Sequence, residues 1–295
     1  MIEEEPYRHV AFGGQRVEVF ATGSNSKSIV DTLFLDAPAG DKDVICCRFT
    51  VHDKDADRLS LVWDGATRYG TRSQDASGIG QCALTLWSEL QYQICNSCDS
   101  GLILHAAAVT VDNQLIIFPG VSGAGKTTLS ASLLAAGANY LTDELVFFNI
   151  ETGFAQCLTR PFNVKHSGQE IVMKLLASAN YEGYCLPNPV GSFIPHRLIN
   201  DTMFRYPGPP QKPFAIIFPR FSVKSSLITE PLSPANASVQ LMSCLVNARN
   251  LDGDGLQGCR KLAESTSAWR MSYGPKRGLL SAIRNIIPTN EVFLR

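Results

Sequence analysis

Eight residues, "GVSGAGKT" at positions 120–127, limit more strongly than any other stretch how this chain folds. They match the pattern G-x4-G-K-[ST], in which glycines let backbone N–H groups turn inward around a string of phosphates. The pattern requires a strand before the loop and a helix after it, because the helix N-terminus adds partial positive charge. The apolar run 115–118 predicts the strand, and a helix is expected from Lys126 to about Ala136. Gly137 is placed to end that helix.

The loop therefore predicts a site for a nucleoside triphosphate. The side chain of Lys126 is expected to reach the β- and γ-phosphates, and the hydroxyl of Thr127 to bind Mg²⁺. ATP and Mg²⁺ are accordingly the expected cofactors. The alternative is a tight turn between a strand and a helix that binds nothing. The candidate nucleotide-binding residues are Gly120, Ser122, Gly123, Ala124, Gly125, Lys126, Thr127 and Thr128.

An acidic pair, Asp143 and Glu144, follows 17 residues after the loop lysine. A switch GTPase would also carry an NKxD motif, which this sequence lacks, and motor ATPases usually have their acidic pair much later in the chain. If the strand ending at Asp143 is the parallel neighbour of the loop's strand, its carboxylate lies over the γ-phosphate. This arrangement is typical of a kinase and predicts Asp143 as general base and Glu144 as a metal ligand. The alternative is a pair that ends a strand and faces solvent.

A third catalytic candidate, besides Lys126 and Asp143, is His105. It lies in the apolar stretch 102–111, which together with 114–120 predicts a hairpin around Asp112 and Asn113. A single histidine among apolar residues is more often part of the core than of a catalytic site. His105 remains a candidate because its strand directly precedes that of the loop.

The length of 295 residues and the pattern along the chain predict two domains. Residues 1–98 are expected to form a small α+β domain, and residues 99–295 an α/β domain with a central sheet and flanking helices. In the first, strands are expected at 16–21, 44–52 and 58–65, loops at 22–28 and 36–43, and a helix within 76–98. In the second, further expectations are a strand or two at 139–150, a strand at 214–221, a helix at 232–248, an ordered loop or flap at 183–213, and one or two closing helices at 262–288, broken at 273–278.

Composition argues against several partners. A hydrophobic content of 45%, a charged content of 18% and a net charge of −1 give no support for nonspecific binding to nucleic acid or to anionic membranes. No apolar run approaches the roughly 20 residues of a membrane span, and the acidic N-terminus does not resemble a signal peptide. A cytoplasmic protein is therefore expected, with association between copies of the chain left open.

The nine cysteines are expected to be reduced and mostly buried. Cys95 and Cys98 form a CxxC, which in other proteins supplies half of a zinc site or a redox pair. The sequence has no second CxxC, so this signal is weak.

The stretch from about 101 to 150, with "LHAAAV" before the loop and "YLTDE" after it, resembles the catalytic domain of the HPr kinase/phosphorylase family. It looks closer still to the HPr-kinase-related proteins encoded beside peptide-modification genes, including lasso peptide clusters. A weaker resemblance continues through "RPFNVKHSG", "FAIIFPRF" and "AWRMSYGPKRG". The resemblance implies a P-loop kinase fold in which residues 120–128 bind the triphosphate, Asp143 is the general base and His105 lies in the catalytic site.

Two departures from that family limit what the resemblance implies. HPr kinases carry two aspartates where this chain has Asp143 and Glu144, and their acceptor-side signature is not recognisable here. HPr is therefore not the expected acceptor. The lasso-associated relatives phosphorylate a serine hydroxyl of a precursor peptide, which implies a serine kinase whose partner is a peptide or protein, held in part by residues 1–98. The reverse reaction with phosphate stays open.

Two other functions remain as alternatives. Shikimate-type kinases also place an aspartate just after the loop's helix, so a small-molecule kinase is one. Such kinases usually add an arginine-rich lid, whereas this chain has only the scattered Arg160, Arg197 and Arg205. The other alternative is a nucleotide-binding regulator without turnover.

Overall fold

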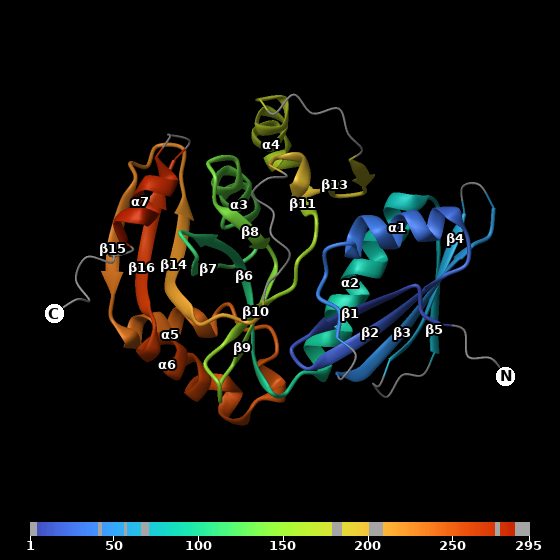
Figure 1. Cartoon of the computed structure of the whole chain (residues 1–295), viewed down its shortest axis with the longest axis horizontal. Coiled ribbons are helices and arrows are strands. Elements are labelled where there is room, and N and C mark those ends of the chain that lie inside the picture. Colours follow the sequence, from blue (N-terminus) through green and yellow to red (C-terminus); the bar gives the residue numbers. More distant parts are fainter. Residues whose placement is uncertain are drawn as a thin grey trace.

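The computed structural model describes residues 5–40, 43–55, 58–65, 71–178, 185–200, 209–274 and 278–286. Within these ranges the chain forms sheets of five, eight and three strands together with seven α-helices, a mixed α/β arrangement (Figure 1). None of the helices in the described residues is both long enough and apolar enough to cross a membrane.

The five-stranded sheet is built from the first part of the chain, in the order β1-β2-β3-β4-β5. Its neighbours are antiparallel except β2 and β3, which are parallel because helix α1 connects them. Helices α1 and α2 pack against each other and against this sheet (Figure 1). The bounds are β1 Arg8–Phe12, β2 Gln15–Ala21, α1 Ser24–Phe34, β3 Val44–Asp53, β4 Leu59–Gly65, β5 Thr71–Ala76 and α2 Ile79–Ser97.

Helix α1 corrects the prediction of a loop at 22–28. Its first turn is held by Asp53 from β3, whose carboxylate accepts hydrogen bonds from the backbone N–H groups of Asn25 (2.9 Å) and Ser26 (2.8 Å). A carboxylate at a helix N-terminus satisfies donors that the helix itself leaves free. The start of α1 therefore depends on a residue almost 30 positions later, which the local polar sequence does not reveal.

Seven strands of the eight-stranded sheet have the order β10-β9-β6-β7-β14-β16-β15. The eighth strand, β8, pairs with β6, which also pairs with β9. Helices α3 and α7 cover one face of its centre, and α5 and α6 cover the other. The bounds are β6 Gly101–Val111, β7 Gln114–Pro119, α3 Lys126–Ala135, β8 Asn139–Thr142, β9 Leu145–Asn149, β10 Ala155–Cys157, β14 Pro213–Phe221, β15 Ile228–Leu232, α5 Pro234–Met242, α6 Leu256–Ser265, β16 Ser267–Tyr273 and α7 Leu279–Ile286.

Two expected helices differ from the structure. Helix α5 is shorter than the predicted 232–248. Of the first closing helix predicted from residue 262, residues 262–265 are helical as the end of α6, but Ser267–Tyr273 form strand β16. This strand pairs in parallel with β14 and antiparallel with β15. Within β16, Ala268, Met271 and Tyr273 are buried against the sheet and its helices. This segment forms a strand because it lies between two partner strands, and its local sequence alone does not indicate that.

The small third sheet lies to the right of α3 and below α4 (His166–Ser178) in Figure 1. Its strands have the order β11 (Phe162–Lys165), β13 (Gly191–Ile194) and β12 (Leu186–Asn188). It contains part of the ordered loop expected at 183–213. Residues 183–184 and 201–208 of that expectation lie outside the described residues.

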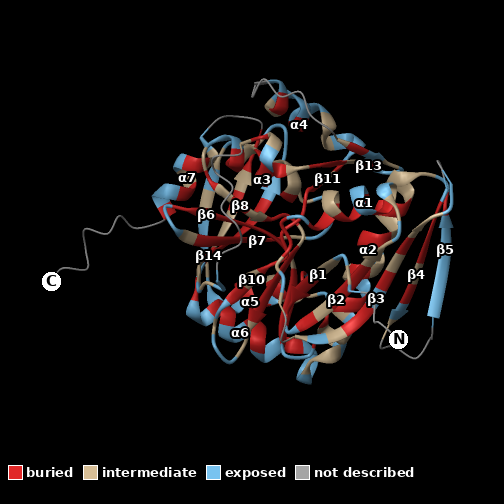
Figure 2. Ribbon diagram, turned by 45° about the vertical axis from the view of Figure 1, so that its right-hand side comes forward, coloured by how far each residue is buried: buried red, intermediate tan, exposed pale blue. Residues whose placement is uncertain are grey.

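One hydrophobic cluster crosses the domain division expected at residue 98. It combines the core of the five-stranded sheet with side chains from later in the chain, and Figure 2 shows buried segments where the two sheets meet. Phe12 of β1, for example, packs edge-on against Phe147 of β9 with ring centroids 6.2 Å apart. The two-domain division stays a proposal. The later residues of the cluster are Ile103, Leu145, Phe147, Leu158, Leu186 and Phe193.

A polar contact also joins the two parts of the chain. Asp36, just after α1, accepts hydrogen bonds from the guanidinium of Arg197, and His196 Nε2 lies 3.2 Å from its carboxylate. Burial alone would raise the pKa of Asp36, but hydrogen bonds and positive charge from His196 and Arg197 outweigh it and lower that pKa to about 2. A lowered carboxyl pKa stabilises the fold above the unfolded-state value of about 4.

Removing this carboxylate with Asp36→Asn is expected to destabilise the protein at pH 6, with the difference from wild type shrinking as the pH falls from about 4 towards 2. Urea unfolding of both proteins at several pH values measures the effect. Asp31→Asn is the control, since Asp31 pairs with Arg8 but its side chain is 43% exposed, and exposed pairs contribute little. A pH-independent difference for Asp36→Asn would contradict the ion pair.

Candidate functional site

The glycine-rich loop connects β7 to α3, as predicted. Gly123 and Gly125 have φ angles of 86° and 87°, in the left-handed region where a side chain is strained. Gly125 is the N-cap of α3, so the loop leads directly into the first turn of the helix. The Lys126 ammonium lies within the loop and donates hydrogen bonds to the carbonyls of Gly120 (2.7 Å) and Val121 (3.2 Å).

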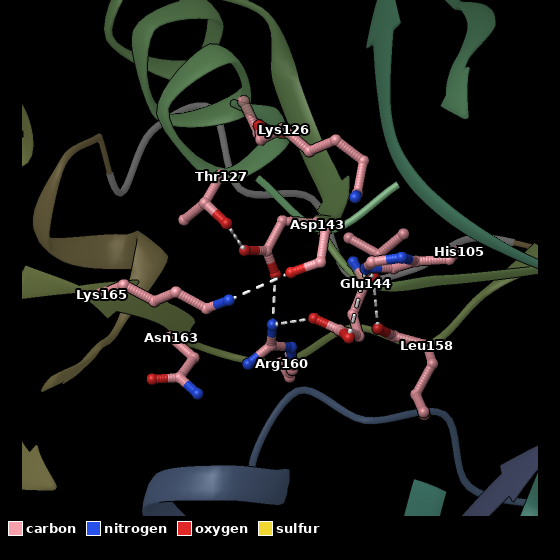
Figure 3. A network of polar contacts seen from close by, with 12 residues as sticks. His105, Lys126, Thr127, Asp143, Glu144, Leu158, Arg160, Asn163 and Lys165 are labelled. Atoms are coloured by element: carbon pink, nitrogen blue, oxygen red, sulfur yellow. Dashed lines mark hydrogen bonds and ion pairs between the residues drawn. The ribbon is translucent and has the colours of Figure 1, made fainter. Parts of the chain in front are cut away.

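The acidic pair lies beside this loop, but not by the strand arrangement expected. Strands β8 and β9 both pair antiparallel with β6, and Asp143 and Glu144 form the bend between them. Strand β6 separates β8 from β7, so the expectation that the two strands are parallel neighbours is wrong. The carboxylate still reaches the loop, because Thr127 Oγ1 donates a 2.7 Å hydrogen bond to Asp143 Oδ2 (Figure 3).

His105, on β6, lies next to the same bend. Its Nε2 is 3.5 Å from Glu144 Oε1, and its carbonyl accepts a hydrogen bond from Gly120 N at the start of the loop. Burial, followed by the positive charge of Lys126, lowers the pKa of His105. Its imidazole is therefore neutral at neutral pH, and it contacts the acidic pair as a neutral group.

Arg160, to which the sequence analysis gave no role, contacts both members of the acidic pair. Its Nη2 lies 3.1 Å from Asp143 Oδ1 and donates a 2.5 Å hydrogen bond to Glu144 Oε2. The guanidinium stacks over the Trp87 ring of α2, 4.8 Å from its centroid, and its side chain is 2% exposed. An ion pair of one buried cation with two carboxylates forms only in the folded chain, so local sequence does not identify it.

The two carboxyl groups titrate as a linked pair. Burial raises the pKa of Asp143, an effect that Arg160 opposes and the adjacent Glu144 reinforces. Burial also acts to raise the pKa of Glu144, but the positive charge of Arg160, together with His105, outweighs it and lowers that pKa. The two shifts have opposite signs because burial prevails at Asp143, whereas the favourable interactions of Glu144 outweigh it.

A cavity of about 440 Å³ brings most of the predicted residues together. Gly120 and Ala124 instead border a separate hollow on the other side of the loop. The cavity also includes residues that the sequence gave no role: Leu84, Trp87, Ser88 and Gln91 of α2, and Arg160, Asn163, Val164, Lys165, Ser167 and Gly168. The predicted residues that line it are His105, Ser122, Gly123, Gly125, Lys126, Thr127, Thr128, Asp143 and Glu144.

The donors in this cavity fit a magnesium ion. Mg²⁺ prefers oxygen ligands and is usually held by one or two carboxylates together with phosphate oxygens. The hydroxyl of Thr127 and the carboxylate of Asp143 already lie within hydrogen-bonding distance of each other. In the part of the chain that the structure describes, this cavity included, no three His, Cys, Asp or Glu side chains form a cluster that could hold a metal by themselves.

The CxxC pair lies away from the cavity, at the end of α2. Burial raises the pKa of both thiols, that of Cys95 to about 12. Cys98 donates to the carbonyl of Gly13 at 3.4 Å, so it links α2 to the turn between β1 and β2. A packing role accounts for these contacts.

No protein-family model matches this chain, and no curated protein matches it either. Among solved structures, it is similar to the Hpr(Ser) kinase/phosphatase from Coxiella burnetii, with 11% sequence identity and a TM-score of 0.31. The alignment covers 63% of this chain and 93% of the other. A likeness this distant assigns no role to any residue.

Proposed function

We propose that this chain is an ATP- and Mg²⁺-dependent phosphotransferase that moves the γ-phosphoryl group to a hydroxyl, specifically that of a serine in a peptide or protein. The observation that carries the proposal is the hydrogen bond between Thr127 and Asp143. It joins a triphosphate-binding loop to an acidic pair inside one cavity. Nucleotide, metal and proton acceptor are thereby within reach of one another, as phosphoryl transfer requires.

In this proposal the loop binds the triphosphate. Its backbone N–H groups and the N-terminus of α3 face the phosphates, and Lys126 adds a full positive charge. Lys165 adds a second charge at the rim, where its ammonium donates a 3.1 Å hydrogen bond to Ser122 Oγ. When bound, Mg²⁺ would be held by Thr127 and the acidic pair, and would neutralise charge on the β- and γ-phosphates.

Helix α2 supports an acceptor larger than a metabolite. Trp87, Ser88 and Gln91 form a wall of the cavity opposite the loop, so the first part of the chain contributes directly to the site. This supports acceptor binding by residues 1–98. A precursor peptide of the lasso type is the acceptor implied by the sequence resemblance, and the nine unpaired cysteines suit a reducing, cytoplasmic setting.

Transfer to serine is tested by incubating the protein with radiolabelled ATP, Mg²⁺ and a library of serine-containing peptides. The expected result is labelled phosphoserine, identified by mass spectrometry, and none when alanine replaces serine. A protein that binds ATP tightly but neither hydrolyses it nor labels any peptide would instead be a nucleotide-binding regulator.

The metal role of Thr127 is tested by Thr127→Val, which keeps the shape of the side chain and removes its hydroxyl. Affinity for a non-hydrolysable ATP analogue is expected to fall at least ~10-fold with Mg²⁺, the scale of losses seen around metal sites, and far less in EDTA. Calorimetric titration measures both. Ser130→Ala is the control, because that hydroxyl bonds to the carbonyl of Lys126 inside α3. Equal losses with and without Mg²⁺ would remove Thr127 from the metal site.

A further inference from the structure

The two carboxylates of the acidic pair are placed differently towards the cavity. The Asp143 side chain is 0% exposed, and contacts surround both of its oxygens (Figure 3). Oδ2 accepts from Thr127, while Oδ1 accepts a 3.2 Å hydrogen bond from Tyr140 and lies 3.1 Å from Arg160 Nη2. Tyr140 is itself fully buried. Asp143 lines the cavity as well, but both of its oxygens are already engaged by Thr127, Tyr140 and Arg160.

Glu144 lies on the open side of the bend. Its side chain is 25% exposed, and only Oε2 is held by the guanidinium of Arg160. The other oxygen, Oε1, is 3.5 Å from Nε2 of His105, whose side chain is 23% exposed. Gln91 of α2 also forms a hydrogen bond with this carboxylate. Glu144 is therefore oriented by neighbours on three elements while remaining reachable from solvent.

A second hollow meets the cavity at Glu144. Its volume is about 290 Å³, and it shares Ser88, Gln91, His105 and Glu144 with the cavity of the loop. Tyr92 and Val246, which are 50% and 44% exposed, lie on its outer side. A group that enters past these two residues meets Glu144 before it reaches the loop.

We propose that Glu144, rather than Asp143, accepts the proton of the acceptor hydroxyl, that Asp143 serves the metal together with Thr127, and that the acceptor enters through the hollow beside Tyr92 and Val246. This assignment rests on the proposed phosphotransferase function and exchanges the roles expected from the sequence. His105 and Arg160 are positioning residues for Glu144.

The acceptor oxygen forms a bond to the γ-phosphorus, and the bond from that phosphorus to the β–γ bridging oxygen breaks, its electron pair leaving with ADP. The hydroxyl proton passes to the carboxylate of Glu144, which later releases it to solvent. The products are the phosphorylated acceptor, ADP and one proton.

The lining of the hollow indicates the class of acceptor. Besides Glu144 and the neutral imidazole of His105, the residues that line it in the described part of the chain are uncharged. A negatively charged residue beside the acceptor serine would be repelled by Glu144, because like charges at close range in a partly buried site interact unfavourably. The hollow therefore fits a serine flanked by uncharged residues, with apolar contact available from Tyr92, Leu145 and Val246.

The division of roles is tested by comparing Glu144→Gln with Asp143→Asn, which both keep shape and remove charge. Two quantities are measured: phosphoryl transfer, with water and with the serine peptide library as acceptors, and affinity for a non-hydrolysable ATP analogue with Mg²⁺ or EDTA. Glu144→Gln is expected to lower transfer by about 10²- to 10⁴-fold, the usual contribution of a general base, and to change Mg²⁺-dependent affinity only a few-fold. Asp143→Asn is expected to lower Mg²⁺-dependent affinity at least ~10-fold.

Because Asp143 is buried beside Arg160, thermal unfolding is used to confirm that Asp143→Asn is folded. Thr127→Val provides the same metal readout without touching that ion pair. The reverse pattern, with the metal loss in Glu144→Gln and the larger loss of transfer in Asp143→Asn, would overturn the exchange of roles while leaving the phosphotransferase intact. A wild-type protein without any phosphoryl transfer would refute the proposed function, and the inference with it.

The acceptor route is tested by Val246→Trp, which fills the outer hollow from a position that does not line the cavity of the loop. Labelling of the peptide library is expected to fall at least tenfold, whereas affinity for the Mg²⁺-bound ATP analogue stays within about twofold. The matched control is Val239→Trp, at a 69% exposed position of α5. Wild-type peptide labelling by folded Val246→Trp would exclude this route.

Discussion

Lys126→Met is expected to lower phosphoryl transfer by at least ~10²- to 10³-fold, the scale of losing one group that stabilises developing charge in a transition state. Methionine keeps most of the length of the side chain but removes the ammonium group that lies within the loop. That ammonium donates to the carbonyls of Gly120 and Val121, so it is already at the place where phosphate oxygens would replace those carbonyls as partners. The measurement is ATP turnover with Mg²⁺, paired with calorimetric titration of the nucleotide.

The fold is expected to survive this change. The two carbonyls that lose a donor belong to the loop, where Val121 is 56% exposed and water can replace the lysine. Lys174→Met is the control, since that ammonium pairs with Glu170 on the surface of α4 and lies outside the cavity. Unchanged turnover by folded Lys126→Met would mean that residues 120–127 do not bind a triphosphate productively.

Arg160→Leu is expected to give the largest loss of stability, about 3–5 kcal/mol at pH 7, because it leaves buried carboxylates without their cation. The loss should depend on pH. Without Arg160 the pKa of Asp143 rises further above its unfolded value, and the pKa of Glu144 is no longer lowered by that cation. The folded state of the variant then binds more protons than its unfolded state. Stability then falls as pH rises, and the deficit relative to wild type narrows between pH 7 and pH 5. Urea unfolding at both pH values measures it.

A compensating variant separates charge from packing. Adding Asp143→Asn and Glu144→Gln to Arg160→Leu removes the uncompensated charges and is expected to recover most of the stability lost. Arg260→Leu, which breaks an exposed pair with Glu264 on α6, should change stability little. If the triple variant is no more stable than Arg160→Leu alone, the loss comes from the contact between Arg160 and Trp87 rather than from the ion pair.

The sequence correctly predicted the helices and the hairpin whose ends are determined by nearby turn or cap residues. The hairpin between β6 and β7 turns at Asp112 and Asn113, whose φ angles of 51° and 65° are those that asparagine and aspartate tolerate best. Helix α3 begins at Lys126 and is followed by Gly137 with φ of 103°. Helix α2 begins after Gly78 and lies within the expected range 76–98. In each case the turn or cap residue lies within a few positions of the element that it bounds.

Elements set by distant partners were not predictable in this way. The first turn of α1 depends on Asp53, and strand β16 depends on its pairing with β14 and β15. Arg160 becomes part of the site only when the segment between β10 and β11 passes beneath α2 and meets the bend at Asp143. Its buried position is a property of three elements together, and a single arginine in a sequence carries no sign of it.

The sequence by itself determined that a phosphate-binding loop is followed at short distance by two adjacent carboxylates. The tertiary structure decided which of the two faces which partner. Asp143 and Glu144 both line the cavity and both contact Arg160, but their remaining partners differ. Along β6, Ala108 pairs with Thr142 and His105 pairs with Leu145. These two pairings fix the position of the bend that contains Asp143 and Glu144. That register turns Asp143 towards Thr127 and Glu144 towards His105, because a shift by one residue would exchange their sides.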